Sequence, residues 1–528
     1  MITKEFEKEL ESLGAFEISN EMLKLAKNND KHNTFLNAGR GNPNWINTEA
    51  RLAFTRIIEF GVMESERTIC DGSLAGYTST YKIGERFENF LDNNKASDKF
   101  LKKVIKYCTS TLAMDKDELV KEFVDGAIGN NYPVPSRCLV NTEKILNMFL
   151  EKELYNGVKL SKETSVFPTE GGTAAICYIF NSLKENKLIK AGDKIAINTP
   201  IFTPYLQIPK LDDYEMVEVD LQSKEEDNWN ISLSELEKLN DESIKALFLV
   251  NPSNPGSKAL NKEVLNKIKE IVEKRKDLII ITDDVYGTFV NGFQTVYSVA
   301  PYNTLLVYSF SKLYGATGWR IGLIATNEDN VFDELIGKLP EKDLKALDEK
   351  YKLVTLEPRK LKFIDRLGAD SRSIGLYHTS GLSTPQQIIM ALFSLTALVS
   401  EGSDVYIETS KKIVESRYHD IVSTLGIDED NSAENAKYYS LIDIYELAEK
   451  KHDRKFAEYL RDKFEEIDFL LKLAEEEGVV LMEGVGFGTT PGTLRISQAN
   501  LPDEAYKKIA ERVLELLNKY YEIYKSQK

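Results

Sequence analysis

The chain has 528 residues, of which 42% are hydrophobic and 29% charged, so we expect a globular protein with two or more domains. Its formal net charge of −16 argues against nucleic acid and anionic membranes as partners, because both bind basic surfaces. The four cysteines form no CxxC pair and the four histidines are scattered, which indicates neither a disulfide framework nor a metal site.

The first residues, MITKEFEKELESLG, are charged and helical in pattern, unlike a secretory signal. No apolar run reaches the roughly 18 residues that span a bilayer. We therefore expect a cytoplasmic protein.

In chain order, residues 1–30 are predicted to form an amphipathic helical arm, followed by the loop LNAGRGNPNW (36–45). Residues 50–165 have a mostly helical pattern. From residue 165 onward, helical stretches alternate with the apolar runs VFP (166–168), DKIAIN (193–198), ALFLVNP (246–252), LIIITDD (278–284), TLLVYSF (304–310) and IGLIAT (321–326). Near-continuous β-branched runs separated by helices predict a largely parallel sheet with helices on both faces.

After these strands, two charged helical segments and the strands of a second, smaller domain are predicted. Residues 327–370 and 440–477 are dense in charge and helical in pattern, whereas GVVLMEGVGFG (478–488) and TLRIS (493–497) are predicted strands. We divide the chain into an N-terminal arm with part of the small domain (1–65), a large domain (66–370) and a C-terminal small domain (371–528).

Two predicted strands end in residues suited to bind a charged ligand. Gly171, Gly172 and Thr173 open a helix, where backbone N–H groups bind anions. Asp283 and Tyr286 lie in TDDVYG, and a carboxylate at a strand end can hold a protonated ring nitrogen. Taken alone, the glycines are better explained by an ordinary turn, and Asp283 equally well by a helix N-cap.

Two further strand ends add an amide and a lysine. Asn254 lies in the turn NPSNPGS (251–257), which needs no ligand but can present an amide to a ligand oxygen. Ser309, Ser311, Lys312 and Arg320 lie in SFSKLYGATGWR, and the two serines and the arginine suit a phosphate. Most lysines at strand ends are solvated charges, but a lysine in a partly dry cleft is a nucleophile towards carbonyl groups.

These motifs together match the requirements of one cofactor. Pyridoxal 5'-phosphate (PLP) needs a phosphate cradle, an aspartate at the ring nitrogen, polar groups at the ring hydroxyl and a Schiff-base lysine. Each signal is weak alone. Four of them in this order, each at a strand end, predict a PLP site.

The order GGT, NPSNPGS, DDVY, SFSK…GWR and LRIS resembles fold-type I PLP enzymes of the aspartate aminotransferase superfamily, over almost the whole chain. The resemblance implies an α/β large domain with a mostly parallel sheet and a smaller α+β domain. It implies Lys312 as the Schiff-base lysine, Asp283 at the ring nitrogen, and Tyr286 and Asn254 at the ring hydroxyl. The residues implied around the phosphate are Gly171, Gly172, Thr173, Ser309, Ser311 and Arg320.

The resemblance implies three further contacts. Phe202, in TPIFTPY, matches the aromatic residue that stacks on the cofactor ring, and Arg495, in TLRIS, matches the arginine that binds the substrate α-carboxylate. Tyr77, in LAGYTSTY, would reach the phosphate in a neighbouring subunit, with Tyr81 as an open alternative. A site shared between subunits implies at least a homodimer, and the family also forms larger assemblies of dimers.

The loop LNAGRGNPNW, the runs FPTEGGTAAICYIFNSL and LYHTSGLSTPQQ, and the length resemble the aspartate 4-decarboxylases. That family implies conversion of L-aspartate to L-alanine and CO2 with a side aminotransferase activity, and Lys312 as the base at Cα. The alternative is a dicarboxylate aminotransferase without decarboxylation.

The residue that orients the substrate β-carboxylate is the least defined part of this prediction. Arg40, next to Gly41 in AGRGNPNW, is our candidate, and an arginine paired with a surface acid is an equally open interpretation. Arg372 and His378 are weaker candidates.

Overall fold

The computed structural model describes residues 15–29, 31–32, 35–211, 214–377, 381–402, 404–464 and 466–527. His378 lies outside these ranges. None of the helices within them is long and apolar enough to cross a membrane.

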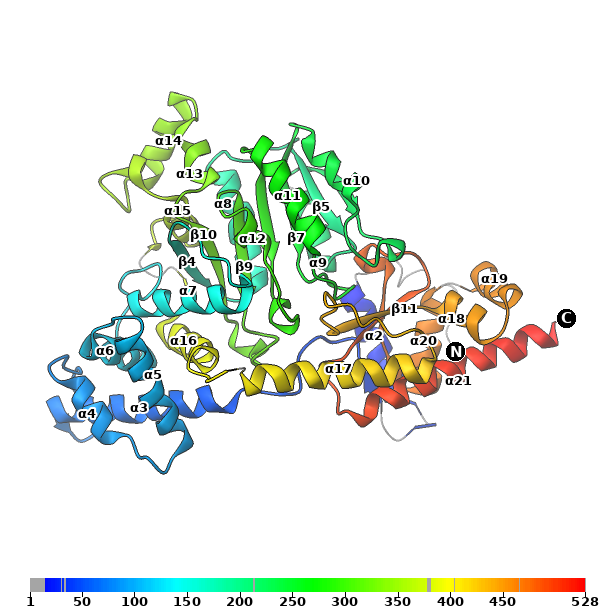
Figure 1. Ribbon diagram of the computed structural model, residues 1–528, viewed down its shortest axis with the longest axis horizontal. Coiled ribbons are helices and arrows are strands. Elements are labelled where there is room, and N and C mark those ends of the chain that lie inside the picture. Colours follow the sequence, from blue (N-terminus) through cyan, green and yellow to red (C-terminus); the bar gives the residue numbers. More distant parts are fainter. Residues whose placement is uncertain are drawn as a thin grey trace.

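A seven-stranded sheet forms the centre of the molecule, in the order β4-β10-β9-β8-β7-β5-β6 (Figure 1). The strands from β5 to β9 pair in parallel, and β10 is antiparallel to both of its neighbours. The strands are β4 (Thr164–Thr169), β5 (Lys194–Thr199), β6 (Val217–Gln222), β7 (Ile244–Val250), β8 (Ile279–Asp283), β9 (Thr304–Ser309) and β10 (Gly322–Asn327). The predicted, largely parallel sheet is confirmed, and β6 is an additional strand at its edge.

Both faces of this sheet are buried. Phe248 of β7 and Ile281 of β8 belong to one hydrophobic cluster, whereas Leu247 and Ile280 belong to another on the opposite face. This alternation explains why the sequence shows continuous apolar runs in these strands. The helices between the strands are α8 (Gly172–Glu185), α9 (Thr203–Leu206), α10 (Leu233–Leu236), α11 (Lys262–Lys274) and α12 (Val296–Val299).

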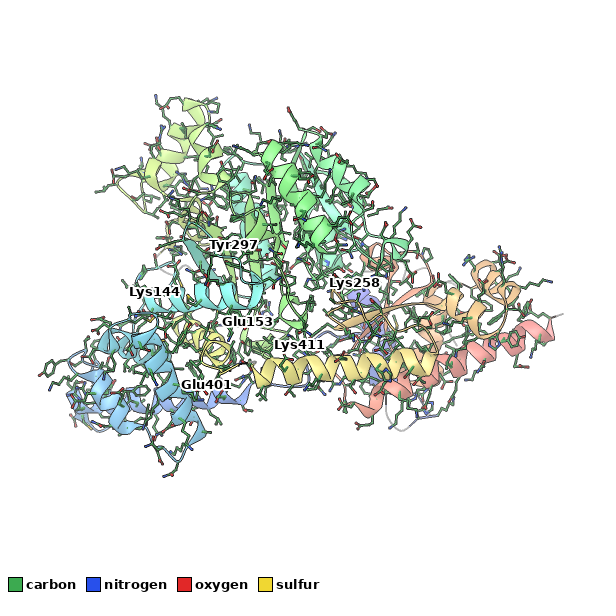
Figure 2. The ribbon with its side chains drawn as sticks, viewed as in Figure 1. Lys144, Glu153, Lys258, Tyr297, Glu401 and Lys411 are labelled. Carbon is green, nitrogen blue, oxygen red and sulfur yellow. The ribbon has the colours of Figure 1, made fainter. Side chains whose placement is uncertain are left out.

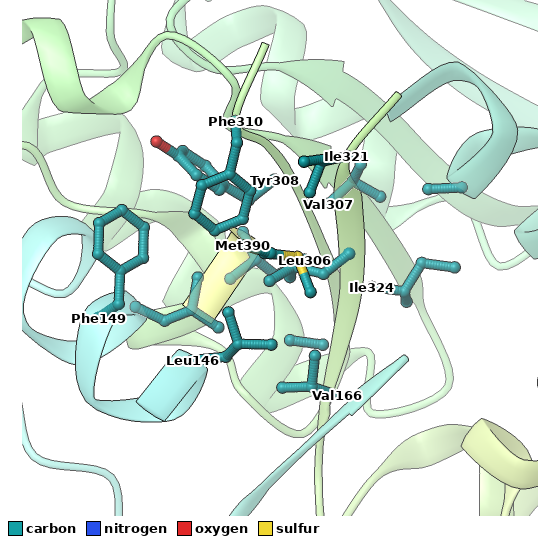
Figure 3. Packing of buried hydrophobic residues seen from close by; sticks show 14 of the residues in the cluster. Leu146, Phe149, Val166, Leu306, Val307, Tyr308, Phe310, Ile321, Ile324 and Met390 are labelled. Carbon is teal, nitrogen blue, oxygen red and sulfur yellow. The ribbon is translucent and has the colours of Figure 1, made fainter. Parts of the chain in front are cut away.

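The end of β9 is held by aromatic packing. Phe149 of α7 (Val140–Leu154) lies with its ring centroid 5.5 Å from those of Tyr308 and Phe310 (Figure 3). Phe310, Leu313 and Tyr314 are all fully buried. The polar residues between these anchors are therefore held in place at the end of the strand.

Helices outside the sheet fill two of the regions that the sequence predicted to be helical, 50–165 and 327–370. The first contains α3 (Thr48–Thr68), α4 (Ile83–Phe90), α5 (Ala96–Ser110) and α6 (Lys116–Ile128), which lie at the lower left of Figure 1. A short hairpin, β2 (Cys70–Asp71) and β3 (Leu74–Ala75), follows α3. The second contains α13 (Val331–Gly337), α14 (Glu341–Tyr351) and α15 (Phe363–Ser371).

The C-terminal part has its own hydrophobic cluster, which also takes in Ile18 and Met22 of α2 (Ala15–Lys27). It contains a three-stranded sheet in the order β11-β14-β13. Its elements are α17 (Val405–Leu425), β11 (Tyr439–Asp443), α18 (Ile444–Lys451), α19 (Arg454–Lys463), α20 (Glu466–Glu477), β12 (Val479–Val480), β13 (Met482–Glu483), β14 (Thr493–Ser497) and α21 (Glu504–Ser526). The predicted strands of the second domain are confirmed, but residues 440–443 form a strand where we predicted a helix.

The hydrophobic clusters cross the predicted domain boundaries. Ala50 of α3 and Ile388 of α16 (Thr384–Leu398) both pack in the cluster that covers the large sheet. The division at residues 65/66 and 370/371 therefore stays a prediction. Lys258, on the loop after β7, forms an ion pair with Asp430, which precedes β11, and so joins the two parts of the chain (Figure 2).

The loop that carries Arg40 is tied to the C-terminal part. Strand β1 (Leu36–Asn37) pairs in parallel with β12, with Leu36 opposite Val479. The Ala38 carbonyl then accepts a hydrogen bond from the Ser497 N–H at 2.8 Å. This pairing brings residues 38–41 beside β14 and over the carboxyl ends of the central strands.

Candidate active site

A cavity of about 240 Å³ lies at the carboxyl ends of β7, β8 and β9. Most of the predicted site residues line it: Gly41, Gly172, Thr173, Phe202, Asn254, Asp283, Tyr286, Ser309, Ser311, Lys312, Arg320 and Arg495. They come from sequence positions 41 to 495, so the fold brings together residues that were grouped only by motif.

One end of the cavity is built for an anion. Gly171 has φ +89° and precedes α8, and a Cβ there would lie 2.7 Å from the Arg320 guanidinium. The glycine thus lets this arginine approach the start of the helix. Ser309 Oγ donates to Ser311 Oγ at 2.9 Å beside it. Helix N–H groups, two hydroxyls and a guanidinium form a phosphate-binding set.

Asp283 ends β8 and is a buried residue of the cavity wall, where a Cβ on Gly172 would lie 3.8 Å from its Oδ2. Its Oδ2 accepts a hydrogen bond from the Tyr205 hydroxyl at 2.8 Å, and its Oδ1 accepts one from the Val285 N–H at 3.2 Å. Burial raises the pKa of this carboxyl to about 6, although these hydrogen bonds and Lys312 act to lower it. A buried carboxylate held in this way suits a cationic ring nitrogen.

Lys312 lines the same cavity. Its Nζ donates to the Gly41 carbonyl oxygen at 3.1 Å, and the Tyr438 hydroxyl donates to the same oxygen at 2.9 Å. The lysine is only half-buried, while its neighbours Ser311 and Leu313 are buried. The amine is thus directed into the cavity by the packing on either side.

Arg495 extends from β14 into the cavity and is almost fully buried. Its Nη1 donates to Asn254 Oδ1 at 3.0 Å and its Nη2 to the Gly39 carbonyl at 2.6 Å. Its Nε is buried without a hydrogen-bond partner among the described residues. A buried guanidinium with an unused donor is well suited to receive a carboxylate.

Three tyrosines that sequence reasoning missed belong to this site. Tyr205 bonds to Asp283, and its position three residues after Phe202 in TPIFTPY was the available signal. Tyr438 immediately precedes β11 and Tyr439 begins it, just before the segment 440–477 that we predicted to be helical. The Tyr439 hydroxyl lies 2.9 Å from that of Tyr286.

Several predicted residues do not line the cavity. Gly171 lies just behind it, against Arg320. Arg40 is exposed, and no described residue pairs with its side chain, so a surface acid as its partner is not supported. Tyr77 is 69% exposed and lines a separate surface hollow together with Tyr132 and Glu170.

Arg372 has protein partners of its own. It forms an ion pair with Glu170 and donates to the Tyr178 hydroxyl at 3.1 Å. These contacts make it a structural residue behind the phosphate end and weaken its candidacy for the β-carboxylate.

Comparison with known proteins identifies the family. A protein-family model described as aminotransferase class I and II matches residues 130–513. The chain belongs to this family. Class I and II aminotransferases depend on PLP, so the predicted cofactor is confirmed, as is the resemblance on which it was based. The anion-binding end, the buried Asp283 and Lys312 all fit this cofactor.

The relatives within the class I and II aminotransferases differ in how much they share with the chain. A bifunctional aspartate aminotransferase and L-aspartate beta-decarboxylase from a Pseudomonas species is 42% identical over 98% of both chains. An aspartate aminotransferase from Pyrococcus abyssi is 34% identical over 26% of this chain and 36% of its own. The first relative therefore matches nearly the whole chain, whereas the second matches about a quarter of it.

Solved structures establish the fold. An aspartate aminotransferase from Thermus thermophilus, determined with maleate, superposes with a TM-score of 0.60 at 17% identity and covers 96% of both chains. A putative kynurenine aminotransferase from Saccharomyces cerevisiae gives a TM-score of 0.60 at 19% identity, covering 98% of this chain and 99% of its own. The predicted fold-type I architecture is confirmed, and enzymes of this fold are typically dimers that act on small molecules.

Proposed function

We propose that this protein is a PLP-dependent L-aspartate 4-decarboxylase, which converts L-aspartate to L-alanine and CO2 and has a side aspartate aminotransferase activity. The observation that carries the proposal is the 42% identity, over 98% of both chains, to a bifunctional enzyme with these two activities. The alternative is an aspartate aminotransferase that does not decarboxylate.

The residues around the cavity would hold the cofactor as follows. The phosphate would bind at the start of α8 with Thr173, Ser309, Ser311 and Arg320, which all line the cavity. Asp283 would serve the protonated ring nitrogen, Tyr286 and Asn254 the ring hydroxyl, and Phe202 the ring face. When bound, PLP supplies an electron sink for the electrons left behind when a bond near the substrate α-carbon breaks.

The substrate is held through its two carboxylates. Arg495 binds the α-carboxylate. The carboxylate accepts a hydrogen bond from the Nε that has no other partner, and it replaces the Gly39 carbonyl as the acceptor for Nη2. Lys312 exchanges its contact with the Gly41 carbonyl for the Cα proton and acts as the general base. The bond between Cβ and the β-carboxylate breaks, CO2 leaves and a proton takes its place on Cβ. The proton that Lys312 removed is returned to Cα, which gives alanine.

Arg40 is our proposed contact for the β-carboxylate. It stands between Gly39, which contacts Arg495, and Gly41, which contacts Lys312, and no described residue occupies its side chain. A loop arginine can orient a carboxylate without the tight clamp that would stabilise the ground state. Arg40→Leu should change the ratio of alanine to oxaloacetate formed, while Arg40→Lys should keep the ratio closer to wild type.

One assay distinguishes the two activities. The purified holoenzyme is incubated with aspartate alone, and CO2 and alanine are measured. Equal amounts of both, formed over many turnovers without a keto acid, support decarboxylation. Oxaloacetate that forms only when 2-oxoglutarate is added, with no CO2, would establish the aminotransferase alternative instead.

We also propose that the enzyme is at least a homodimer with a shared cofactor site. Tyr77, the predicted contact to a neighbouring subunit's phosphate, is exposed and outside the cavity of its own chain, as is Tyr81. Tyr132 is equally exposed and lies inside the matched family region that begins at residue 130, so it competes for this role. Light scattering gives the oligomer size, and PLP affinity in Tyr77→Phe, Tyr81→Phe and Tyr132→Phe identifies the contact. The cytoplasmic location stays a prediction.

A further inference from the structure

Tyr439 connects two parts of the active site that belong to different sheets. Its hydroxyl lies 2.9 Å from the hydroxyl of Tyr286, which follows β8 of the large sheet. Its ring lies under Arg495, with the guanidinium carbon 4.4 Å from the ring centroid. Tyr439 is 3% exposed and lines the cavity, so both contacts are made without competition from solvent.

The backbone fixes Tyr439 in this position. Its N–H donates to Ser257 Oγ at 2.7 Å, from the loop after β7. Within the small sheet, β11 pairs antiparallel with β14, and Tyr439 lies opposite Ser497, two residues from Arg495. The residue is therefore held by the large sheet on one side and by the arginine strand on the other.

We propose that Tyr439 is a positioning residue that acts through Tyr286 on the cofactor ring oxygen and through Arg495 on the substrate carboxylate. The hydroxyl carries the first effect and the ring carries the second. The inference rests on the cofactor chemistry of the family. It applies both to a decarboxylase and to an aminotransferase.

The negative charge on the cofactor ring oxygen sets the direction of the hydrogen bonds from Tyr439 to Tyr286 and from Tyr286 to the ring oxygen. The Tyr286 hydroxyl has a single hydrogen. When it donates this hydrogen to the negatively charged ring oxygen, it has no hydrogen left to donate to Tyr439. The Tyr286 oxygen is then left to accept, and Tyr439 is the donor within reach. A hydroxyl that accepts a hydrogen bond donates more strongly, so Tyr439 strengthens the contact of Tyr286 with the cofactor.

The first test is the pH midpoint of the visible absorbance of the holoenzyme. The ring oxygen carries most negative charge in the high-pH form, so a weaker contact from Tyr286 moves the midpoint upward. For Tyr439→Phe we expect a rise of about 0.2–0.7 pH unit, the effect of one buried hydrogen bond strengthening its neighbour by tens of per cent. The charged and titratable groups around this pair are Tyr438, Arg495, Lys312 and Asp283.

A double-mutant cycle tests whether the effect passes through Tyr286. Tyr286→Phe alone should raise the midpoint more than Tyr439→Phe does. In the Tyr286→Phe background, adding Tyr439→Phe should leave the midpoint unchanged. Equal shifts in both backgrounds would overturn the relay, because the hydroxyl would then act on the cofactor by another route.

The second test separates the ring from the hydroxyl. Maleate is a dicarboxylate that cannot react, and its dissociation constant is measured by its effect on the absorbance spectrum. Tyr439→Phe keeps the ring under Arg495 and should change the constant less than twofold. Tyr439→Leu should raise it about threefold or more, the range expected for a lost buried cation–π contact.

Tyr297→Phe is the matched control. Tyr297 is also fully buried, and its hydroxyl lies 2.9 Å from Thr164 Oγ1, outside the cavity (Figure 2). It should lower the thermal midpoint as Tyr439→Phe does but leave the absorbance midpoint unchanged. If Tyr439→Phe also moves only the thermal midpoint, its role is structural and the proposal fails. Neither readout needs CO2 release, so a failed decarboxylation assay is distinguishable from a failed relay.

Discussion

Tyr439 and Gly41 touch across the two parts of the active site. A Cβ added to residue 41 would lie 2.0 Å from the Tyr439 hydroxyl oxygen. The Gly41 carbonyl is the acceptor for Lys312 Nζ, so the absence of a side chain at residue 41 allows the loop to reach both residues.

Gly41→Ala should therefore lower activity on the order of a hundredfold, because the loop must move away from Lys312. Gly318→Ala is the control, since no heavy atom of the described residues, apart from its chain neighbours, lies within 4 Å of a Cβ there. The steady-state rate with aspartate is measured for both variants. The double variant Gly41→Ala/Tyr439→Phe lacks the obstructing hydroxyl oxygen and should recover part of the lost rate. A double variant that is no faster than Gly41→Ala would contradict this explanation.

Lys312→Ala should abolish the covalent attachment of the cofactor and lower the rate by at least about a thousandfold, as expected for loss of a general base. Borohydride reduction of the wild-type enzyme followed by peptide mapping should place the label on Lys312. The far-ultraviolet circular dichroism of the variant should remain that of the wild type. A label on another lysine would refute the assignment.

The affinity of the cofactor-free protein for PLP should fall as the pH decreases below about 6. Burial raises the pKa of Asp283 to about 6, and below that pH the protonated carboxyl no longer attracts the cationic ring nitrogen. Asp283→Asn should bind PLP more weakly above pH 6 and lose this component of the pH dependence. Equilibrium titrations of both proteins between pH 5 and 8 measure it, and parallel curves would argue against the role of Asp283.

Asp284 provides a test of stability instead of catalysis. It is fully buried, and burial raises the pKa of its carboxyl to about 8. The folded protein thus keeps a proton that the unfolded chain, with an ordinary pKa of about 4, has already released, so stability decreases as the pH rises from about 4 to about 8.

Asp284→Asn removes this titration while keeping an oxygen acceptor for the Thr282 hydroxyl. The variant should match the wild type near pH 4 and unfold at a temperature a few degrees higher at pH 8. Thermal unfolding followed at both pH values checks this. The same difference in midpoint at both would show that Asp284 does not keep its proton.

The sequence singled out the strand-end residues that line the cavity because burial leaves a local signature. Asp283 ends one largely apolar strand and Lys312 lies three residues after another, and a charged residue there stands out. Tyr439 had no such signature, since its role depends on Ser257, Tyr286 and Arg495, which are distant in sequence.

Two other differences also arise from tertiary structure. The edge strand β6 was missed because its residues are mostly half-buried or exposed and form no apolar run. Strand β11 was missed because it precedes a charge-rich helical segment, and its pairing with β14 decides its conformation.

The pairing of β1 with β12 has a consequence for the biogenesis of the enzyme. Leu36 finds its strand partner at Val479, so the ribosome must add 479 − 36 = 443 further residues before this ladder can form. The segment that carries Gly41 is synthesised early and has no strand partner until β12 is made. Lys312 and the phosphate-binding loop are synthesised before Arg495. A nascent chain can thus present most of the cofactor cradle but not the substrate-binding wall, and the site becomes complete only in the last stage of synthesis.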